Sequence, residues 1–244
     1  MEPQTKKVSI VVPCYNEERT IYEILRRALQ VDLNIPGLQR EIIIVDDGST
    51  DDSWEQIQSF AADNPDAPLI TVRHDTNRGK GRAIRTALDR ADGDYLIVQD
   101  ADLEYYAEDY PDLLKPLVDG APVVYGNRRQ GRLWRRHISG LVYAMGGLFQ
   151  NLFYKMLFWH GPKITDIATC YKCFHMDVIR ELPLQCEGFE FCTEVSALLA
   201  NRNIPIKEIP IRYQPRKKWQ GKKITSRDFF IGLYTLLKNR IKKR

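Results

Sequence analysis

The sequence predicts an α/β fold in which a mostly parallel sheet is flanked by helices. Over the first hundred residues, short apolar runs alternate with segments of helical periodicity. This order is typical of right-handed βαβ crossovers, which bury a parallel sheet on both faces. Acidic and polar residues directly follow three of the apolar runs. Ligands bind at that edge of such sheets, so the same pattern predicts where the site lies.

Each element follows from one of two patterns. Short runs rich in apolar residues predict strands at residues 8–12, 41–45, 69–73, 95–99, 123–126 and 206–211. Apolar residues spaced by three and four predict helices at residues 17–29, 52–62, 82–91, 176–182, 193–201 and 227–240. The chain has 244 residues, 43% of them hydrophobic, and no internal repeat. We therefore expect one domain over residues 1–244, since two full cores would be a tight fit.

Residues 138–159 form the most apolar stretch, and its length approaches that of a membrane span. Gln150, Asn151 and Lys155 interrupt it and aromatic residues recur through it, which favours an amphipathic helix on a bilayer surface. A plain core helix fits the periodicity equally well. The net charge is +4, and basic residues cluster in 128–136 and again towards the C-terminus. Such clusters suit phosphates or an anionic membrane surface, and a solvated basic face is the alternative.

The N-terminus and the cysteines indicate where in the cell the protein is located. The first seven residues are polar and lead straight into a strand, which does not fit a signal peptide. The five cysteines are an odd number without a disulfide framework, which favours a reducing compartment. Zinc is weakly indicated, because Cys170 and Cys173 form a C-x-x-C pair but Cys186 and Cys192 have another spacing. We expect a cytoplasmic protein, peripheral at the cytoplasmic face of a membrane, without a nucleic-acid partner.

Three acids form the sharpest local feature. Asp100, Asp102 and Glu104 lie at i, i+2 and i+4 just after an apolar run. If the extended conformation persists, all three side chains point to the same side. Carboxylates so close repel one another unless a cation neutralises them, and hard oxygen ligands suit Mg²⁺ or Mn²⁺. The alternative is a polar turn with exposed acids.

Two further loops follow apolar runs or precede a helix. Asp46 and Asp47 end a strand, where a carboxylate can accept hydrogen bonds from a nucleobase or ribose. Helix capping by Asp47 or Ser49 is the alternative, and both can hold at once. Residues 77–81 contain two glycines and a lysine before a helix, which allows close approach to an anion.

Taken together, these segments resemble glycosyltransferase family 2, in the order and spacing of its dolichol-phosphate mannosyltransferase branch and the bacterial polyprenyl-phosphate glycosyltransferases. The motifs are V-S-I-V-V-P-C-Y-N-E-E, I-I-I-V-D-D-G-S-T-D, N-R-G-K-G-x-A-I, D-G-D-Y-L-I-V-Q-D-A-D-L-E, Y-G-N-R, D-I-A-T-C-Y-K-C-F, G-F-E-F-C-T-E-V and E-I-P-I-R-Y-Q-P-R. The resemblance covers residues 8–240. It implies a GT-A-type nucleotide-sugar-binding fold, with a nucleotide-binding half at about 8–126 and a sugar and acceptor half at about 127–244.

The resemblance also implies a reaction and its partners. An inverting glycosyltransferase of this kind moves a hexose, mannose or glucose, from GDP-mannose or UDP-glucose onto a polyprenyl (dolichyl-type) phosphate. It uses Mg²⁺ or Mn²⁺ and works at a membrane surface, in some relatives with additional membrane-spanning helices. A membrane-anchoring partner protein is therefore compatible with it.

Site residues are implied position by position. The catalytic residues would be Asp102, Arg128 and Glu194. The nucleotide-sugar would be bound by Pro13, Tyr15, Glu17, Asp46, Asp47, Lys80, Asp100, Ala101, Asp102, Arg128, Arg216, Lys222 and Lys223. The metal would be held by Asp100, Asp102 and Glu104, and Glu104 stands where the mannosyltransferases usually have Gln. The acceptor would be bound by Arg135, Arg136, Thr169 and Lys172. Glu194 has a structural alternative, as a buried acid paired with an arginine.

Other functions predict other features. A hydroxyl acceptor needs a general base, for which Asp166, Glu190 and Glu194 are the candidates. A phosphate acceptor has a second pKa near ~6 and is already nucleophilic, so it needs cations instead, and Arg128 to Arg136 supply them. A sugar-phosphate nucleotidyltransferase would open with a glycine-rich loop. A non-catalytic nucleotide-sugar-binding or membrane-adaptor module would not need Asp102 and Arg128 intact.

Overall fold

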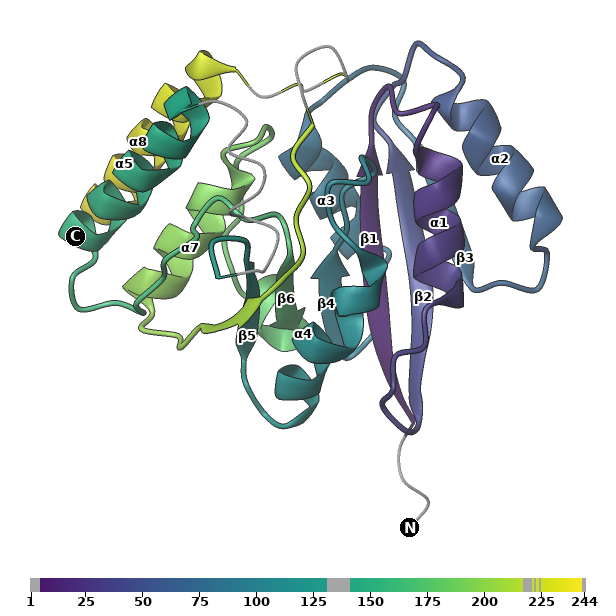
Figure 1. Cartoon of the computed structure of the whole chain (residues 1–244), viewed down its shortest axis with the longest axis horizontal. Helices are drawn as coiled ribbons and strands as arrows, with labels where there is room; N and C mark the ends of the chain where they lie inside the picture. The colour runs from purple at the N-terminus through teal and green to yellow at the C-terminus, as the bar shows by residue number, and fades with distance from the viewer. Residues whose placement is uncertain (1–4, 131–140, 217–220, 222, 224, 243–244) are drawn as a thin grey trace.

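The computed structural model describes residues 5–130, 141–216, 221, 223 and 225–242. Its centre is a seven-stranded sheet in the order β3-β2-β1-β4-β6-β5-β7 (Figure 1). The strands are β1 (Lys6–Cys14), β2 (Leu38–Asp46), β3 (Leu69–Arg73), β4 (Tyr95–Val98), β5 (Val123–Asn127), β6 (Lys172–His175) and β7 (Lys207–Pro210). Strand β6 runs antiparallel to both of its neighbours, and the other pairs are parallel. The predicted α/β fold with a mostly parallel sheet is thus confirmed.

Helices cover both faces of this sheet. They are α1 (Ile21–Gln30), α2 (Ser53–Asp63), α3 (Lys80–Leu88), α4 (Tyr110–Val118), α5 (Leu141–Leu157), α6 (Met176–Arg180), α7 (Phe191–Asn201) and α8 (Ser226–Ile241), with a short 3₁₀ turn, η1 (Ala107–Asp109). Apolar residues of α1, α2 and α4 pack on one face, and those of α3, α6 and α7 pack on the other. The two layers give the sheet a core on each side, as βαβ crossovers require.

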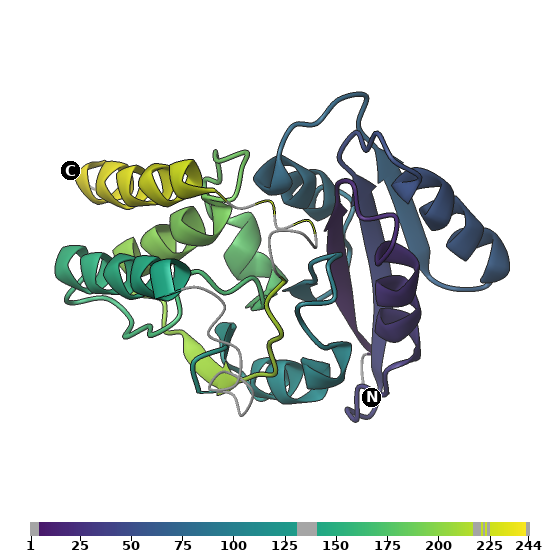
Figure 2. The ribbon, with the colours of Figure 1, turned by 45° about the horizontal axis from the view of Figure 1, so that its top comes forward.

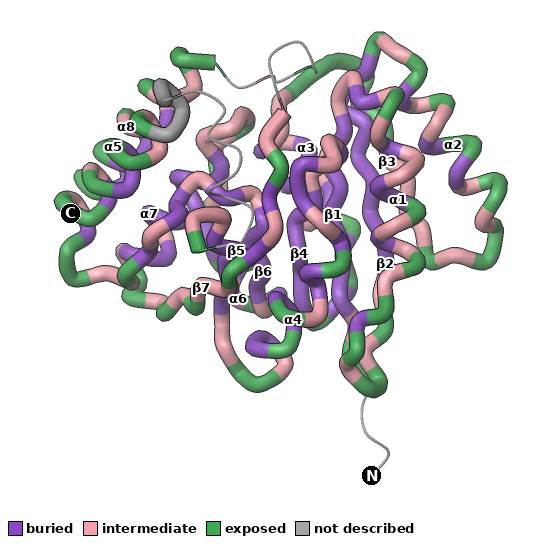
Figure 3. The backbone as a smooth tube through the Cα atoms, in the orientation of Figure 1, coloured by how far each residue is buried: buried purple, intermediate pink, exposed green. Residues whose placement is uncertain are grey.

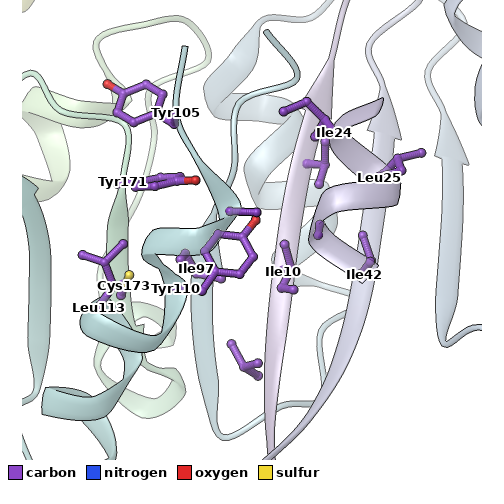
Figure 4. Packing of buried hydrophobic residues seen from close by; sticks show 14 of the residues in the cluster. Ile10, Ile24, Leu25, Ile42, Ile97, Tyr105, Tyr110, Leu113, Tyr171 and Cys173 are labelled. Carbon is purple, nitrogen blue, oxygen red and sulfur yellow. The ribbon is translucent and has the colours of Figure 1, made fainter. Parts of the chain in front are cut away.

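The alternation of side chains along β1 divides the core in two. Val8, Ile10 and Val12 belong to the cluster under α1 and α4, while Val11 points to the opposite cluster under α3 and α7. Figure 4 shows Ile10 among the side chains of the first cluster, with Tyr110 and Tyr171 nearby. These buried apolar strands hold the ends of β1, β2 and β4 in fixed positions at one edge of the sheet.

Helices α5 and α8 lie side by side on one flank, beyond α7 and far from β3 (Figure 2). Figure 3 shows exposed positions recurring along both of them, while the central strands are buried. The predicted amphipathic helix is present where it is described, from Leu141 to Leu157. In the described part of the chain, no helix is long and apolar enough to span a bilayer.

Two elements had no counterpart among the predictions, α4 and β6. Helix α4 contains Pro111 in its first turn, where proline is tolerated, and Pro116 near its end, which reads as a helix breaker. Strand β6 has only four residues, too few for a recognisable pattern. The predicted helix over 17–29 begins later, at Ile21, because residues 17–20 form a turn in which Thr20 donates to the Glu17 carbonyl.

Candidate active site

Three strands deliver the predicted site residues to one edge of the sheet. β1, β2 and β4 are parallel, so the segments after Cys14, Asp46 and Val98 leave the sheet together (Figure 1). The loop after β1 is tied to the loop after β4 by the Thr20 hydroxyl, which donates to the Ala101 carbonyl oxygen at 2.6 Å. This places Glu17 beside the acids at positions 100–104, as the sequence predicts.

The chain between Asp100 and Glu104 turns instead of continuing as a strand. Residues 101 and 102 form a turn, and Leu103 has a left-handed φ of 55°. The expected extended conformation is therefore wrong for this segment. Because of this turn, the three acids have different partners. Asp100 pairs with a lysine, while Asp102 and Glu104 share an arginine.

Arg216 is the cation that gathers the acids. Its guanidinium donates to Glu17 at 2.8 and 3.0 Å and to Asp102 at 2.9 Å. Its backbone N–H donates to Glu104 at 2.7 Å, and Nε lies 3.7 Å from the same carboxylate. Lys223 adds a second cation through its ion pair with Glu17. Acids from the first half of the chain are thus balanced by cations from its C-terminal quarter.

Around Asp102, the effects of burial and negative charge outweigh the positive charge of Arg216. Burial and the neighbouring Asp100 and Glu104 carboxylates raise the pKa of Asp102 to about 7, although Arg216 opposes them. A carboxyl group in this state favours any further cation that reaches it. The described residues contain no group of three or more His, Cys, Asp or Glu side chains arranged to hold a metal. Carboxylate oxygens of Asp102 and Glu104 are nevertheless the hard ligands that Mg²⁺ and Mn²⁺ take.

Lys80 forms a buried ion pair with Asp100 at the first turn of α3. Burial opposes the charge on Lys80, but the Asp100 carboxylate outweighs it and raises the lysine pKa above its usual range. Lys80 Nζ also lies 3.1 Å from the Cys170 sulfur. Gly79, with φ of 95°, lets the loop pass so close to the backbone of Glu187 that a Cβ would meet its oxygen at 2.3 Å. The predicted loop thus brings Lys80 to the acids.

Arg128 is held by Asp166 at the end of β5. Both carboxylate oxygens of Asp166 accept hydrogen bonds from the guanidinium, at 2.7 and 2.9 Å, and one also accepts the Arg128 backbone N–H at 3.0 Å. The guanidinium carbon lies 5.0 Å from the ring centre of Tyr213, whose hydroxyl donates to Glu104 at 2.7 Å. Tyr213 therefore links Arg128 to the acid cluster.

Glu208 on β7 holds the backbone at Asp166 in place through hydrogen bonds. Its carboxylate accepts the backbone N–H of Asp166 at 3.0 Å and that of Thr165 at 2.9 Å. Sequence reasoning missed Glu208 and Tyr213, although both lie in the E-I-P-I-R-Y motif. The motif pointed to the segment, but these contacts join residues 43 and 109 positions apart and carry no local pattern.

The two aspartates after β2 differ in their surroundings. Asp47 accepts the backbone N–H groups of Arg78 and Gly79 at 3.0 and 2.7 Å and pairs with His74 at 2.7 Å. It shapes the 77–81 loop. Asp46 accepts the Ser49 backbone N–H with one oxygen, which also lies 3.3 Å from Arg73 Nε, while its other oxygen is buried and has no hydrogen-bond partner among the described residues. Only Asp46 thus keeps an acceptor for a ligand.

Several predicted residues lie away from the acid cluster. Glu194 is buried, and its carboxylate accepts the backbone N–H of Gln185 at 3.0 and 3.1 Å and that of Cys186 at 3.0 Å. These contacts favour the structural alternative, with backbone amides instead of an arginine as partners. Thr169 and Lys172 are fully buried, and Lys172 Nζ lies 3.4 Å from the Tyr125 ring centre. Neither presents its side chain at a surface where an acceptor could bind.

The remaining predicted residues are partly placed. Pro13 and Tyr15 lie at the end of β1, and Lys223 Nζ is 6.0 Å from the Tyr15 ring centre and 3.2 Å from the Asn16 carbonyl oxygen. Among the described residues, Lys223 thus reaches Glu17. Lys222, Arg135 and Arg136 lie outside the described residues.

Known proteins have similar sequences. The chain is 28% identical over 249 residues to a dolichol-phosphate mannosyltransferase of Pyrococcus furiosus, covering 95% of this chain and 64% of that protein. It is 32% identical over 218 residues to an undecaprenyl-phosphate 4-deoxy-4-formamido-L-arabinose transferase of Edwardsiella ictaluri, covering 88% of this chain and 62% of that protein. It therefore spans less than two thirds of either relative.

The fold matches a solved GT-A structure. Glucosyl-3-phosphoglycerate synthase from Mycobacterium tuberculosis, in complex with Mn²⁺, uridine diphosphate and phosphoglyceric acid, superimposes with a TM-score of 0.71 at 18% identity. The match covers 98% of this chain and 78% of the synthase. At this identity the likeness establishes the GT-A fold. The model of glycosyl transferase family 2 matches residues 9–182, which include the acid cluster, Lys80 and the Arg128–Asp166 pair. On this match and on the fold, the chain belongs to glycosyltransferase family 2.

Proposed function

We propose that this chain transfers a hexose, with inversion, from a nucleotide-sugar to a polyprenyl phosphate. The observation that carries the proposal is the cluster in which Arg216 joins Glu17, Asp102 and Glu104 at the carboxyl edge of the sheet. It offers cations for a diphosphate and acids for a metal within one group of side chains. In the transfer, the bond between the anomeric carbon and the diphosphate breaks, its electron pair leaves with the nucleoside diphosphate, and an acceptor phosphate oxygen bonds to that carbon.

The donor would be bound by the residues at the ends of β1, β2 and β4. Asp46 has a buried oxygen with no partner among the described residues, which could accept a hydrogen bond from a nucleobase or a ribose hydroxyl. Arg216 and Lys223 would exchange part of their carboxylate contacts for phosphate oxygens, for which a guanidinium has the matching geometry. Lys80 stays paired with Asp100 and keeps that carboxylate oriented.

A divalent cation fits the acid cluster. Asp102 and Glu104 would hold Mg²⁺ or Mn²⁺, and the raised pKa of Asp102 shows that burial and the neighbouring carboxylates outweigh Arg216, so a further cation would be favoured there. When bound, the ion supplies positive charge that stabilises the departing diphosphate. Asp100, predicted as a third ligand, is engaged by Lys80. The solved synthase complexes with Mn²⁺ or Mg²⁺ and uridine diphosphate support this choice of metal at the level of the fold.

The acceptor follows from which side chains are free to act. A hydroxyl acceptor needs a base, but both oxygens of Asp166 are taken by Arg128 and both oxygens of Glu194 by backbone amides. Glu190, the third candidate, accepts the backbone N–H of Gly188, in the loop whose amides also donate to Glu194. A phosphate dianion needs no base, and Arg128 supplies a buried cation. Two similar proteins named as polyprenyl-phosphate sugar transferases support the same acceptor.

A lipid acceptor places the reaction at a membrane surface. We propose the cytoplasmic face, where nucleotide-sugars would be available and the five cysteines would stay reduced. GDP-mannose and UDP-glucose are both retained as donors, and a membrane-anchoring partner protein remains a prediction.

The test is a panel of donors and acceptors. The protein is incubated with Mn²⁺ or Mg²⁺, labelled GDP-mannose or UDP-glucose, and undecaprenyl or dolichyl phosphate, and lipid-extractable label is measured. We expect label in the lipid phase for one donor, and its loss in EDTA and in Asp102→Ala. Transfer to a free glycan but not to the lipid would support a hydroxyl acceptor. Donor binding without transfer to either acceptor would support a non-catalytic module.

A further inference from the structure

The exposed apolar side chains of this protein are gathered in one place. Among the described residues, every large hydrophobic side chain that is exposed lies on α5, immediately after it, or on α8. We call these residues the α5–α8 surface: Met145, Leu148, Phe149, Leu152, Met156, Trp159, Phe230, Tyr234, Leu237 and Ile241. Their exposed fractions run from 41% to 71%, and such concentration marks an interaction site more than scattered exposure does.

The two helices contribute to one continuous surface. On each helix the exposed residues recur at spacings of three and four, which places them along one stripe. The helices lie side by side (Figure 2). Phe149 and Phe229 join them, with ring centres 6.0 Å apart, and Phe230 follows at 5.3 Å from Phe229. The inner side of α5, by contrast, is buried through Gln150, Asn151 and Tyr154.

The charged side chains interleaved with the exposed apolar residues are lysines. Lys155 is exposed between Leu152 and Trp159, and Lys238 is exposed between Tyr234 and Ile241, at the same spacings of three and four. The sequence has no acidic residue between Asp119 and Asp166, and none after Asp228. The apolar stripes are therefore interleaved with lysines and free of acids. This combination complements an anionic lipid surface, where lysine stems lie along apolar groups and the ammonium meets headgroups.

A cavity adjoins the end of this surface. It has a volume of about 310 Å³ and lies where α5, α7 and α8 end, with Trp159, His160 and Arg240 in its lining. Arg240 is the only charged side chain among the described residues that line it. A tryptophan beside a cation is a common arrangement at the level of lipid headgroups.

We propose that the α5–α8 surface docks this chain onto a bilayer that contains anionic lipids, with both helices lying in the plane of the interface. The proposal extends the proposed function, because a lipid-borne acceptor has to be met at a membrane. A second copy of the chain would cover the same apolar residues, but like-charged lysines on both copies would then face each other. An anionic bilayer satisfies the apolar and the basic residues together.

Vesicle cosedimentation of the whole chain tests the proposal without donor or acceptor. The probes are vesicles of pure phosphatidylcholine and vesicles that contain phosphatidylglycerol as well, at low and high salt. We expect binding to the anionic vesicles, weakened by salt. Lys155→Glu with Lys238→Glu should weaken it by roughly fivefold or more for each residue. Leu152→Ser with Tyr234→Ser should weaken it by roughly tenfold or more at either salt concentration.

Matched variants away from the α5–α8 surface control for charge and folding. Arg90→Glu with Lys115→Glu makes the same charge change at exposed positions on other elements, and should leave vesicle binding unchanged beyond a small electrostatic effect. Each variant's melting temperature should match that of the original chain. The proposal is overturned if the unchanged chain does not bind anionic vesicles, or if the control pair Arg90 and Lys115 affects binding as much as Lys155 and Lys238. A dimer in light scattering that Leu152→Ser with Tyr234→Ser dissolves, without vesicle binding, would identify the surface as a protein interface.

Activity separates this proposal from the proposed function. With a short, water-soluble polyprenyl phosphate as acceptor, the α5–α8 variants should turn over at the original rate, since the acceptor no longer has to be reached in a membrane. With a long-chain acceptor in vesicles they should be slower. Vesicle binding without any transfer would leave the docking surface standing and refute the reaction. Transfer without vesicle binding would do the reverse.

Discussion

Asp166 binds the guanidinium of Arg128 with both carboxylate oxygens, at 2.7 and 2.9 Å, in a pair in which Asp166 is buried and the Arg128 side chain is 17% exposed. Removing one partner of a buried ion pair leaves an uncompensated charge, which costs about 3–5 kcal/mol of stability. We therefore expect Asp166→Asn to lower the free energy of unfolding by about that amount, measured by chemical denaturation.

The exposed pair between Lys115 and Asp119 is the matched control. It lies at 3.0 Å on the surface of α4, where an ion pair contributes about 0–1 kcal/mol. Asp119→Asn should accordingly change stability by less than about 1 kcal/mol. Equal losses in the two variants would show that burial of the Arg128 pair is not what stabilises it.

The raised pKa of Asp102 predicts a pH dependence of stability. Its pKa is about 7 in the folded chain, above the value of 3.8 for an unperturbed aspartate, so the folded state holds a proton that the unfolded state has lost. The stabilisation from this group is complete below pH 3.8 and is lost as the pH rises through about 7. Without metal, the melting temperature should fall over pH 5 to about 8, and Asp102→Asn should flatten this fall.

Asp100 supplies the opposite control for that experiment. Burial opposes its charge, but Lys80 outweighs burial and lowers the pKa of Asp100, so its ionised form is the stabilising one. Asp100→Asn should destabilise the chain at neutral pH, where Asp102→Asn stabilises it. The same sign for both substitutions would contradict the assignment of charges in the cluster.

Arg216 should govern the affinity for a nucleoside diphosphate. Its guanidinium contacts Glu17, Asp102 and Glu104, and charge-assisted contacts to phosphate of this kind are each worth about 1.5–3 kcal/mol. Arg216→Ala should weaken binding of GDP or UDP with Mn²⁺ by roughly 10- to 100-fold in calorimetry. Arg212→Ala, which removes a partner of Asp109 instead, should leave this affinity within about twofold.

Substitutions of Asp46 and Asp47 should have different effects on stability and on nucleotide binding. Asp47 holds two backbone N–H groups and His74, so Asp47→Asn should lower the melting temperature by roughly 2–4 °C for each kcal/mol lost. Asp46 has an oxygen that no described residue contacts by a hydrogen bond, so Asp46→Asn should mainly weaken nucleotide binding. Calorimetry and thermal melts on the two variants decide this, and the reverse pattern would exchange the roles.

Glu194 was predicted as catalytic, and kinetics can decide between that role and a structural one. Its carboxylate accepts backbone N–H groups of the 185–188 loop, which packs against the Lys80 loop through the Gly81 N–H and Gly188 carbonyl at 3.2 Å. Glu194→Gln should therefore lower the melting temperature while kcat changes less than about tenfold. A large loss of kcat in a fully stable variant would restore the catalytic assignment.

The sequence predicted the half of the site that depends on local pattern. Apolar runs located β1, β2 and β4, and the parallel order then placed Glu17, Asp46 and Asp102 at one edge. What it could not predict is which partner each charge finds. Arg216 reaches Glu17 across 199 positions, and Lys172, predicted at the acceptor, is buried against Tyr125. Tertiary packing decides which side chains meet, and the spacing of residues along the sequence does not reveal these contacts.

The position of strand β6 in the sheet affects how the chain can fold during synthesis. Residues 172–175 lie between β4 and β5, which precede them in the chain, so β5 has no neighbour on its β4 side until that segment arrives. During synthesis, the first half would therefore leave the ribosome with the edge of β4 unpaired, and open strand edges recruit other chains. A fragment ending at Asn127 should aggregate, which would mean that the two halves of this chain fold as a single unit.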